Sequence, residues 1–275
     1  MQKMLFLFLV CFFSLASGAQ TYQQHVRKAM DCLAMDSVER AKQHFRQAIR
    51  LEPNTEATAL LHKYMGQIYE HEGEHQNALD SYTKGLHILV GDTALLARRA
   101  GLYLLLGNED RAIADYTEIL SKDKHCVEAL FFRAYSYTQQ RRYPQARKDY
   151  EEIIRLDPMH ENAHLGLIVL NDKDRRPREA MEGINRLIEY YPRHSHLYLV
   201  RAGLEEQRKQ YETARHDYDQ AIALAPQDAE AYMARATFCL NINDRKQAMA
   251  DLKQAIKLGA DPDEVATLMH QATKK

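Results

Sequence analysis

The chain has 275 residues, with 37 Lys and Arg against 38 Asp and Glu and a formal net charge of −1. So balanced a charge argues against a strong field for nucleic acid or a membrane surface, although local charged patches stay open. No nucleic-acid partner is therefore expected. Hydrophobic residues make up 45% of the chain, enough to form the cores of one or two ordinary domains.

Residues 1–19 have the pattern of a secretory signal peptide. Lys3 gives a positive start, a mostly apolar run extends from Leu5 to Leu15, and residues 17–19 are small. The run is too short to span a bilayer comfortably, so no transmembrane span is expected in the mature chain. We expect cleavage before Gln20, and an uncleaved anchor is the alternative.

The rest of the chain repeats itself, with a period of 34 residues from Ala78 onward and a first interval of 37. The copies align on an alanine that begins a second apolar run, with an aromatic or large apolar residue four positions later and a small residue twelve positions earlier. The alanines are Ala41, Ala78, Ala112, Ala146, Ala180, Ala214 and Ala248. The large residues are Phe45, Tyr82, Tyr116, Tyr150, Ile184, Tyr218 and Leu252. The earlier residues are Ala29, Gly66, Ala100, Ala134, Ile168, Ala202 and Ala236.

Each copy predicts two helices. In the copy 127–160, apolar residues recur at helical spacing on either side of a polar break, and Pro158 ends the second run because proline cannot continue a helix. Small residues on facing helices allow close approach, and the large residue fills the space beside them. One such pair cannot bury its apolar faces alone, so the copies must stack.

This pattern resembles the tetratricopeptide repeat family, whose 34-residue helix–turn–helix has small, aromatic, alanine and proline positions at these offsets. The resemblance implies an all-α fold, a right-handed α-solenoid of seven units over residues 20–260. The units are 22–55, 59–92, 93–126, 127–160, 161–194, 195–228 and 229–260. Residues 261–275 are expected to form a capping helix that begins at Asp261 and Pro262 and packs Val265 inward.

The fifth unit departs most from the pattern. Ile168, Asn171 and Ile184 stand where small, Tyr and aromatic residues are usual, so irregular packing is expected there. Three cysteines, Cys32, Cys126 and Cys239, remain after cleavage. They are odd in number and repeats apart, which predicts buried free thiols and no disulfide.

Four arginines each precede an aspartate by 16 residues. The pairs are Arg99 with Asp115, Arg133 with Asp149, Arg201 with Asp217, and Arg235 with Asp251. Such regular recurrence indicates structural ion pairs between helices, which would add ~0–1 kcal/mol each if exposed.

The sequence His71-Glu72-Gly73-Glu74-His75 is a literal H-E-x-x-H, the zinc-peptidase motif. That motif needs one continuous helix, whereas here it falls in the turn between two helices, where Gly73 aligns with Gly107. A zinc metallopeptidase is therefore only a remote alternative. The His194-Ser195-His196 stretch has no acid or thiol nearby in a pattern suggesting a metal site. No catalytic residues, metal site or cofactor are expected, and the chain is not expected to be an enzyme.

The resemblance implies that first helices line a concave groove that recognises peptides or protein segments. Carried over by column, the groove candidates are Lys63, Tyr64, Gln67, Arg98, Phe131, Phe132, Tyr135, Leu199 and Val200. Exposed aromatics with an arginine are the composition of interaction hot spots. The alternative is that Phe131 or Phe132 simply packs against the next first helix.

We therefore expect a non-enzymatic protein–protein interaction scaffold, exported to the periplasm or outer envelope of a Gram-negative bacterium. The bacterial assignment rests on the absence of companion domains and of any N-x-[ST] sequon. Two alternatives are an exported co-chaperone, whose J-domain would be a separate chain because no His-Pro-Asp occurs here, and a glycan-binding envelope protein, which the absence of tryptophan disfavours. The partner and the oligomeric state are left open.

Overall fold

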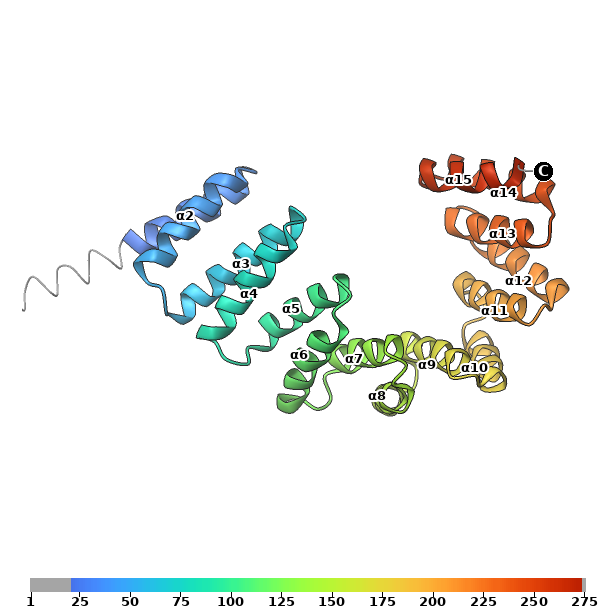
Figure 1. The fold of residues 1–275 in the computed structure, drawn as a ribbon, viewed down its shortest axis with the longest axis horizontal. Coiled ribbons are helices and arrows are strands. Elements are labelled where there is room, and N and C mark those ends of the chain that lie inside the picture. The colour runs from blue at the N-terminus through green and yellow to red at the C-terminus, as the bar shows by residue number, and fades with distance from the viewer. Residues whose placement is uncertain (1–20, 274–275) are drawn as a thin grey trace, which may run out of the picture. The chain divides into compact units, whose positions relative to one another are not determined.

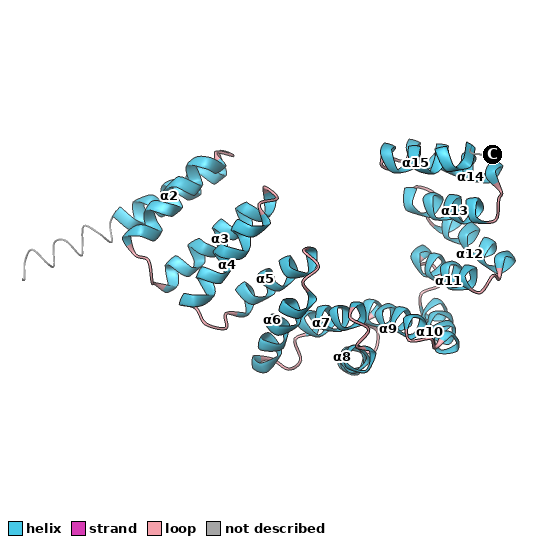
Figure 2. Cartoon of the chain, viewed as in Figure 1, coloured by secondary structure: helices cyan, strands magenta, loops and turns pink. Residues whose placement is uncertain are grey.

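A computed structural model describes residues 21–273, whose regular structure is entirely helical (Figures 1 and 2). Within this range no helix is both long and apolar enough to cross a membrane. The predicted signal peptide, residues 1–19, and Gln20 lie outside the described residues.

The chain divides into two compact units, Met1–Gln140 and Arg141–Lys275. In the first unit a helix over residues 21–34 precedes α2 (Val38–Leu51), α3 (Glu56–His71), α4 (His75–Ile88), α5 (Thr93–Leu105), α6 (Glu109–Lys122) and α7 (Val127–Gln139). The second unit contains α8 (Tyr143–Leu156), α9 (Glu161–Lys173), α10 (Pro177–Tyr190), α11 (Ser195–Gln207), α12 (Tyr211–Leu224), α13 (Ala229–Asn241), α14 (Arg245–Lys257) and α15 (Pro262–Thr273).

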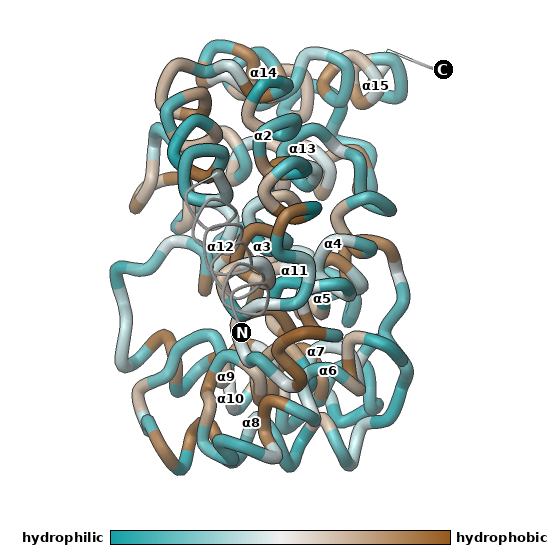
Figure 3. The backbone as a smooth tube through the Cα atoms, turned by 90° about the vertical axis from the view of Figure 1, so that its left-hand side faces the viewer, coloured by the Kyte–Doolittle hydropathy of each residue, from teal (hydrophilic) through white to brown (hydrophobic). Residues whose placement is uncertain are grey.

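These helices confirm the predicted all-α fold of seven helix pairs and a C-terminal helix. The pairs α3–α4, α5–α6, α9–α10, α11–α12 and α13–α14 each pack as a hairpin. The boundary between the compact units falls inside the fourth repeat, between α7 and α8. Hydrophilic and hydrophobic stretches are mixed along the helices (Figure 3), because each helix buries one face and exposes another.

The three repeat columns form the core. All seven alanines of the second helices are fully buried, and the large residues that follow them, from Phe45 to Leu252, are at most 5% exposed. Gly66 shows why the facing column is small: a Cβ there would lie only 2.7 Å from Cδ1 of Tyr82. The aromatic ring therefore occupies the space that a larger residue would need.

The hairpin turns within the two compact units share one pattern of backbone hydrogen bonding. After α5, the N–H of Gly107 donates to Leu104 O and that of Asn108 to Tyr103 O, the pattern of a Schellman C-cap. The same longer bond joins Glu74 N to Tyr69 O. Gly107 and Gly73 have φ of +67° and +73°, the left-handed region that ends a helix at least cost with glycine.

Three of the four predicted ion pairs are confirmed. Arg99, Arg201 and Arg235 each form two hydrogen bonds to the aspartate 16 residues later, at 2.6–2.9 Å. These aspartates are buried, with side chains 2–6% exposed, so the low value for exposed pairs does not apply to them. Arg133 and Asp149 belong to different compact units, and their pairing stays a prediction.

The expected irregularity of the fifth repeat is not seen in the lengths of α9 and α10, which are 13 and 14 residues as in the neighbouring repeats. Ile168 fits because Gly183 faces it: a Cβ at position 183 would lie 2.8 Å from Cγ1 of Ile168. Gly183 occupies the aspartate column and Leu167 the arginine column. An apolar contact therefore replaces the ion pair.

Two further predictions have mixed outcomes. Asp261 caps α15, accepting hydrogen bonds from the N–H groups of Asp263 and Glu264, and Val265 is fully buried, as expected. The cysteines within residues 21–273 are free thiols. Only Cys239 is buried, and burial raises the pKa of its thiol to about 11. Cys32 and Cys126 are partly exposed because they lie near the ends of their helices, which corrects the expectation that all three are buried.

Candidate partner-binding site

An open cavity of about 940 Å³ lies in the first compact unit, on the side of the first helices of its repeats. We call it the aromatic cavity. Its lining residues are Glu70, Ala94, Ala97, Arg98, Gly101, Leu104, Leu105, Tyr116, Glu128, Phe131, Phe132 and Tyr135. All but Tyr116 lie on α3, α5 or α7, so its walls depend on the stacking of successive first helices.

The floor of the aromatic cavity is a cluster of rings. Phe132 stacks on Tyr116 with 5.8 Å between ring centroids, and Phe131 meets Phe132 edge-on at 5.5 Å. Stacking on the core residue Tyr116 leaves Phe132 half-buried and fixes its position. Tyr135 and Leu105 are 44% and 68% exposed, so they offer apolar surface to a ligand.

Residues of both charges lie at the rim of the aromatic cavity. Arg98 and Glu128 are exposed. Glu70 accepts a hydrogen bond from the hydroxyl of Tyr82, so its carboxylate is held in place. Burial, followed by the charges of Glu128 and Asp115, raises the pKa of Tyr116. Tyr116 therefore stays neutral at physiological pH and acts as an apolar wall.

Gly101 leaves the cavity open. A Cβ at this position of α5 would meet no atom within 4 Å, because the glycine faces the empty space rather than a packed helix. A site that is mostly apolar, with a few charged groups at its edge, suits an apolar side chain of a peptide flanked by charged or polar residues.

The aromatic cavity brings together four of the nine groove candidates, Arg98, Phe131, Phe132 and Tyr135. The other five lie elsewhere. Lys63, Tyr64 and Gln67 are on α3, where Tyr64 stacks on Phe45 with ring centroids 6.1 Å apart. Leu199 and Val200 are in the second unit, half-buried against the core around Leu197 and Ile184. No single site within a unit unites all nine.

Sequence reasoning missed most of the cavity wall. The repeat columns predicted Tyr116 as a core residue only, and it also contributes to the lining of the cavity. The run of three leucines at positions 104–106 was the sequence signal available for Leu105, because three successive residues of a helix cannot all face a core. No sequence signal marked Gly101 as an opening.

The H-E-x-x-H stretch has the broken geometry expected. His71 is the last residue of α3, Gly73 has φ of +73°, and His75 begins α4. The two histidines therefore lie on different helices, and Glu72 forms hydrogen bonds with Lys42 at 2.8 and 2.9 Å. Residues 71–75 lack the one-helix arrangement of a zinc peptidase.

Stacked helix hairpins with these columns define an α-helical repeat protein with a candidate peptide-binding surface. A family model described as tetratricopeptide repeat matches residues 97–161, 133–188 and 199–265. The chain belongs to the tetratricopeptide repeat family, whose members generally act as protein–protein interaction scaffolds.

Relatives are similar to this chain over different extents. DnaJ homolog subfamily C member 7 of Homo sapiens is 27% identical over 143 residues, which cover 47% of this chain and 29% of that protein. Tetratricopeptide repeat protein 12 of Mus musculus is 28% identical over 123 residues, 45% of this chain and 16% of that protein. The matches thus span less than a third of either relative.

Among solved structures, a tetratricopeptide repeat protein from Parabacteroides merdae ATCC 43184 has a TM-score of 0.78 and 27% identity, covering 93% of this chain and 100% of that chain. PilW, described as a type IV pilus biogenesis factor, has a TM-score of 0.57 and 15% identity, covering 75% and 94%. At that identity PilW shows the fold alone.

Proposed function

We propose that this protein is an exported, non-enzymatic scaffold that binds a peptide or protein segment in the aromatic cavity. The observation that carries the proposal is the cavity itself, where Tyr135 and Leu105 are exposed beside a fixed pair of phenylalanine rings. Exposed apolar surface of this kind is usually covered by a partner.

The cavity favours one kind of segment. A leucine-sized or aromatic side chain would sit on Phe131 and Phe132, and a carboxylate next to it in the partner would pair with Arg98 at the rim. The rings are held by packing before the ligand arrives, so little conformational entropy is lost on binding. Affinity then depends on apolar burial more than on charge.

Site-specific photo-crosslinking tests this proposal. A photoreactive phenylalanine analogue replaces Tyr135 in the cavity or, as a control, Tyr211, which is 41% exposed on α12. Both positions are open enough to accept the analogue without repacking the core. In cells that produce the full precursor, we expect irradiation to give a distinct partner adduct from position 135 and none from position 211.

The control decides the outcome. The same adducts from both positions would mean that crosslinking reports random collision. A partner adduct from position 211 alone would move the binding surface to α12 and overturn the cavity assignment.

Export to the periplasm or outer envelope of a Gram-negative bacterium is part of the proposal. It is supported by the signal-like pattern of residues 1–19 and by similarity over nearly the whole chain to a protein of Parabacteroides merdae. Intact-mass measurement of the cell-envelope protein is expected to show a chain that begins at Gln20. A chain retaining residues 1–19 would contradict cleavage.

A co-chaperone role is a second candidate, favoured by the similarity to human DnaJ homolog subfamily C member 7. In that case the segment bound in the aromatic cavity would belong to a chaperone or its client. The photo-crosslinked adduct distinguishes the two roles, because its identification by mass spectrometry shows whether a chaperone is the partner.

A further inference from the structure

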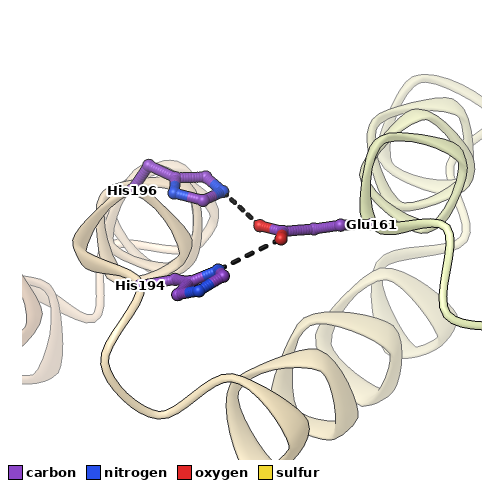
Figure 4. A group of neighbouring side chains, drawn as sticks. All are labelled: Glu161, His194 and His196. Atoms are coloured by element: carbon purple, nitrogen blue, oxygen red, sulfur yellow. Dashed lines mark hydrogen bonds and ion pairs between the residues drawn. The ribbon is translucent and has the colours of Figure 1, made fainter.

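One cluster of side chains in the second compact unit is not explained by peptide binding. It consists of Glu161, His194 and His196, and we call it the histidine cluster (Figure 4). Glu161 is the first residue of α9, His194 is the N-cap of α11, and His196 lies in the first turn of α11. Successive repeats place these helix ends side by side, so residues 33 and 35 positions apart meet.

The geometry converges on the carboxylate. In Figure 4 the side chain of Glu161 points toward the two imidazole rings, with one carboxylate oxygen facing each ring. Its Oε2 lies 3.1 Å from Nδ1 of His194, and its Oε1 lies 2.6 Å from Nε2 of His196. One ligand atom from each of the three residues lies within 4.8 Å of the others.

We propose that the histidine cluster binds a divalent transition metal ion, with zinc as the representative. Two imidazole nitrogens and one carboxylate oxygen are a donor set that zinc accepts, with water completing the coordination. The proposal revises the expectation from the sequence that the chain has no metal site, and it is independent of the aromatic cavity.

The surroundings support a ligand at this place. Oε1 of Glu161 is shielded from solvent and has no hydrogen bond of good geometry within the described residues, despite the close approach of His196. A metal ion would satisfy that oxygen and be bound by both ring nitrogens at the same time.

Neighbouring groups position one ligand and leave access to the others. The ring of Tyr191 stacks on His194 with centroids 5.0 Å apart, and its hydroxyl donates to Met159 O at 3.0 Å. The side chains of His194 and His196 are 44% and 49% exposed. An ion can therefore enter from solution and keep water ligands.

Binding should depend on pH because protons compete for the same nitrogens. Neutral imidazole is the ligand form, so each histidine must lose its proton before the metal binds. Zinc affinity is therefore expected to be weaker in acidic solution than at neutral pH.

Zinc titration of the full chain without a histidine tag tests the proposal, with a chromophoric chelator as competitor. We expect one tightly bound zinc per chain. His196→Ala and Glu161→Gln are expected to weaken it by more than ~10-fold, the lower limit for loss of even an outer-sphere partner. Because the site joins two repeats, zinc should also raise the thermal unfolding midpoint of the wild type and not that of Glu161→Gln.

Two histidine variants outside the cluster serve as controls. His164→Ala changes a histidine of α9 that contacts Pro158 O, and His71→Ala disrupts the H-E-x-x-H stretch. Both should retain the wild-type affinity. Zinc affinity that is unchanged in His196→Ala and Glu161→Gln would overturn the proposal, and so would zinc lost in His71→Ala alone. Circular dichroism of each variant confirms that the fold is intact.

Discussion

At the scale of single residues, the hairpin turns carry a repeated conformational cost. Seven turn residues in one column have positive φ, and five of them are not glycine. They are Asp36, Gly73, Gly107, Arg141, Arg175, Lys209 and Asn243. The left-handed region costs a residue with a Cβ roughly 1–2 kcal/mol. In most of the turns the surrounding contacts, rather than the intrinsic backbone preference of the residue, therefore stabilise this conformation.

Replacement of Lys209 by glycine is expected to stabilise the protein. Lys209 is exposed and has φ of +59°, so Lys209→Gly removes strain without removing a core contact. Part of the gain is lost to the greater freedom of glycine in the unfolded chain, leaving up to about 1 kcal/mol. The reverse change, Gly107→Ala, should cost about 1 kcal/mol. Urea unfolding measures both, and a loss of stability in Lys209→Gly would contradict this explanation of the turns.

Individual residues also show what could be read from the sequence. The alignment columns predicted the core correctly, because one physical constraint recurs seven times and each copy tests the others. The same phase places Glu161 and Ser195 at equivalent positions of successive repeats, so the neighbourhood of Glu161 and His194 could have been inferred. Oxygen and nitrogen distances within it could not, because they depend on rotamers that packing selects.

At the scale of helices, the recurring arginines link successive repeats. The guanidinium of Arg201 binds Asp217 of its own repeat in a bidentate pair and donates to Oδ1 of Asn185 in the preceding repeat at 2.9 Å. Arg235 bridges Asp251 and Asp219 in the same way. Stability in a repeat protein depends on the interfaces between neighbouring repeats. These arginines therefore stabilise the protein at those interfaces.

Loss of one such arginine is expected to be costly. Arg201→Leu leaves Asp217, whose side chain is 2% exposed, without its cation, and we expect a loss of about 3 kcal/mol. The fifth repeat shows a combination of residues that replaces this ion pair. Leu167, Ile168 and Gly183 stand at the positions that correspond to Arg201, Ala202 and Asp217 of the sixth repeat.

A triple variant tests this reading directly. Arg201→Leu with Ala202→Ile and Asp217→Gly copies the fifth-repeat arrangement, and it should be more stable than Arg201→Leu alone in thermal and urea unfolding. A triple variant less stable than the single one would show that the contact of Ile168 with Gly183 is not a substitute for the ion pair.

At the scale of the whole chain, the sequence predicted the architecture better than the site. Phe131, Phe132 and Tyr135 were found because they share one helix, where spacing alone defines a face. Leu105, Tyr116 and Gly101 complete the aromatic cavity from two other helices. Its opening results from how these helices stack, which composition and spacing do not determine. Leu199 and Val200 occupy the same repeat positions as Phe131 and Phe132, but they lie against core residues.

The central claim is that the aromatic cavity binds a protein segment, and one pair of matched variants tests it. Gly101→Leu fills the cavity, whereas Gly203→Leu makes the same change at the corresponding position of α11 in the other unit. A Cβ at either position meets no atom within 4 Å. Both changes also remove a mid-helix glycine, which favours the helix by about 1 kcal/mol. Neither variant should lose stability.

The measurement is the binding of peptides selected by display on the wild-type protein. We expect the selected peptides to share a large apolar side chain, to bind wild type and Gly203→Leu equally, and to bind Gly101→Leu at least ~10-fold more weakly, because leucine occupies the space of the ligand side chain. Peptides that bind all three proteins with equal affinity would contradict the account and place the binding surface outside the aromatic cavity.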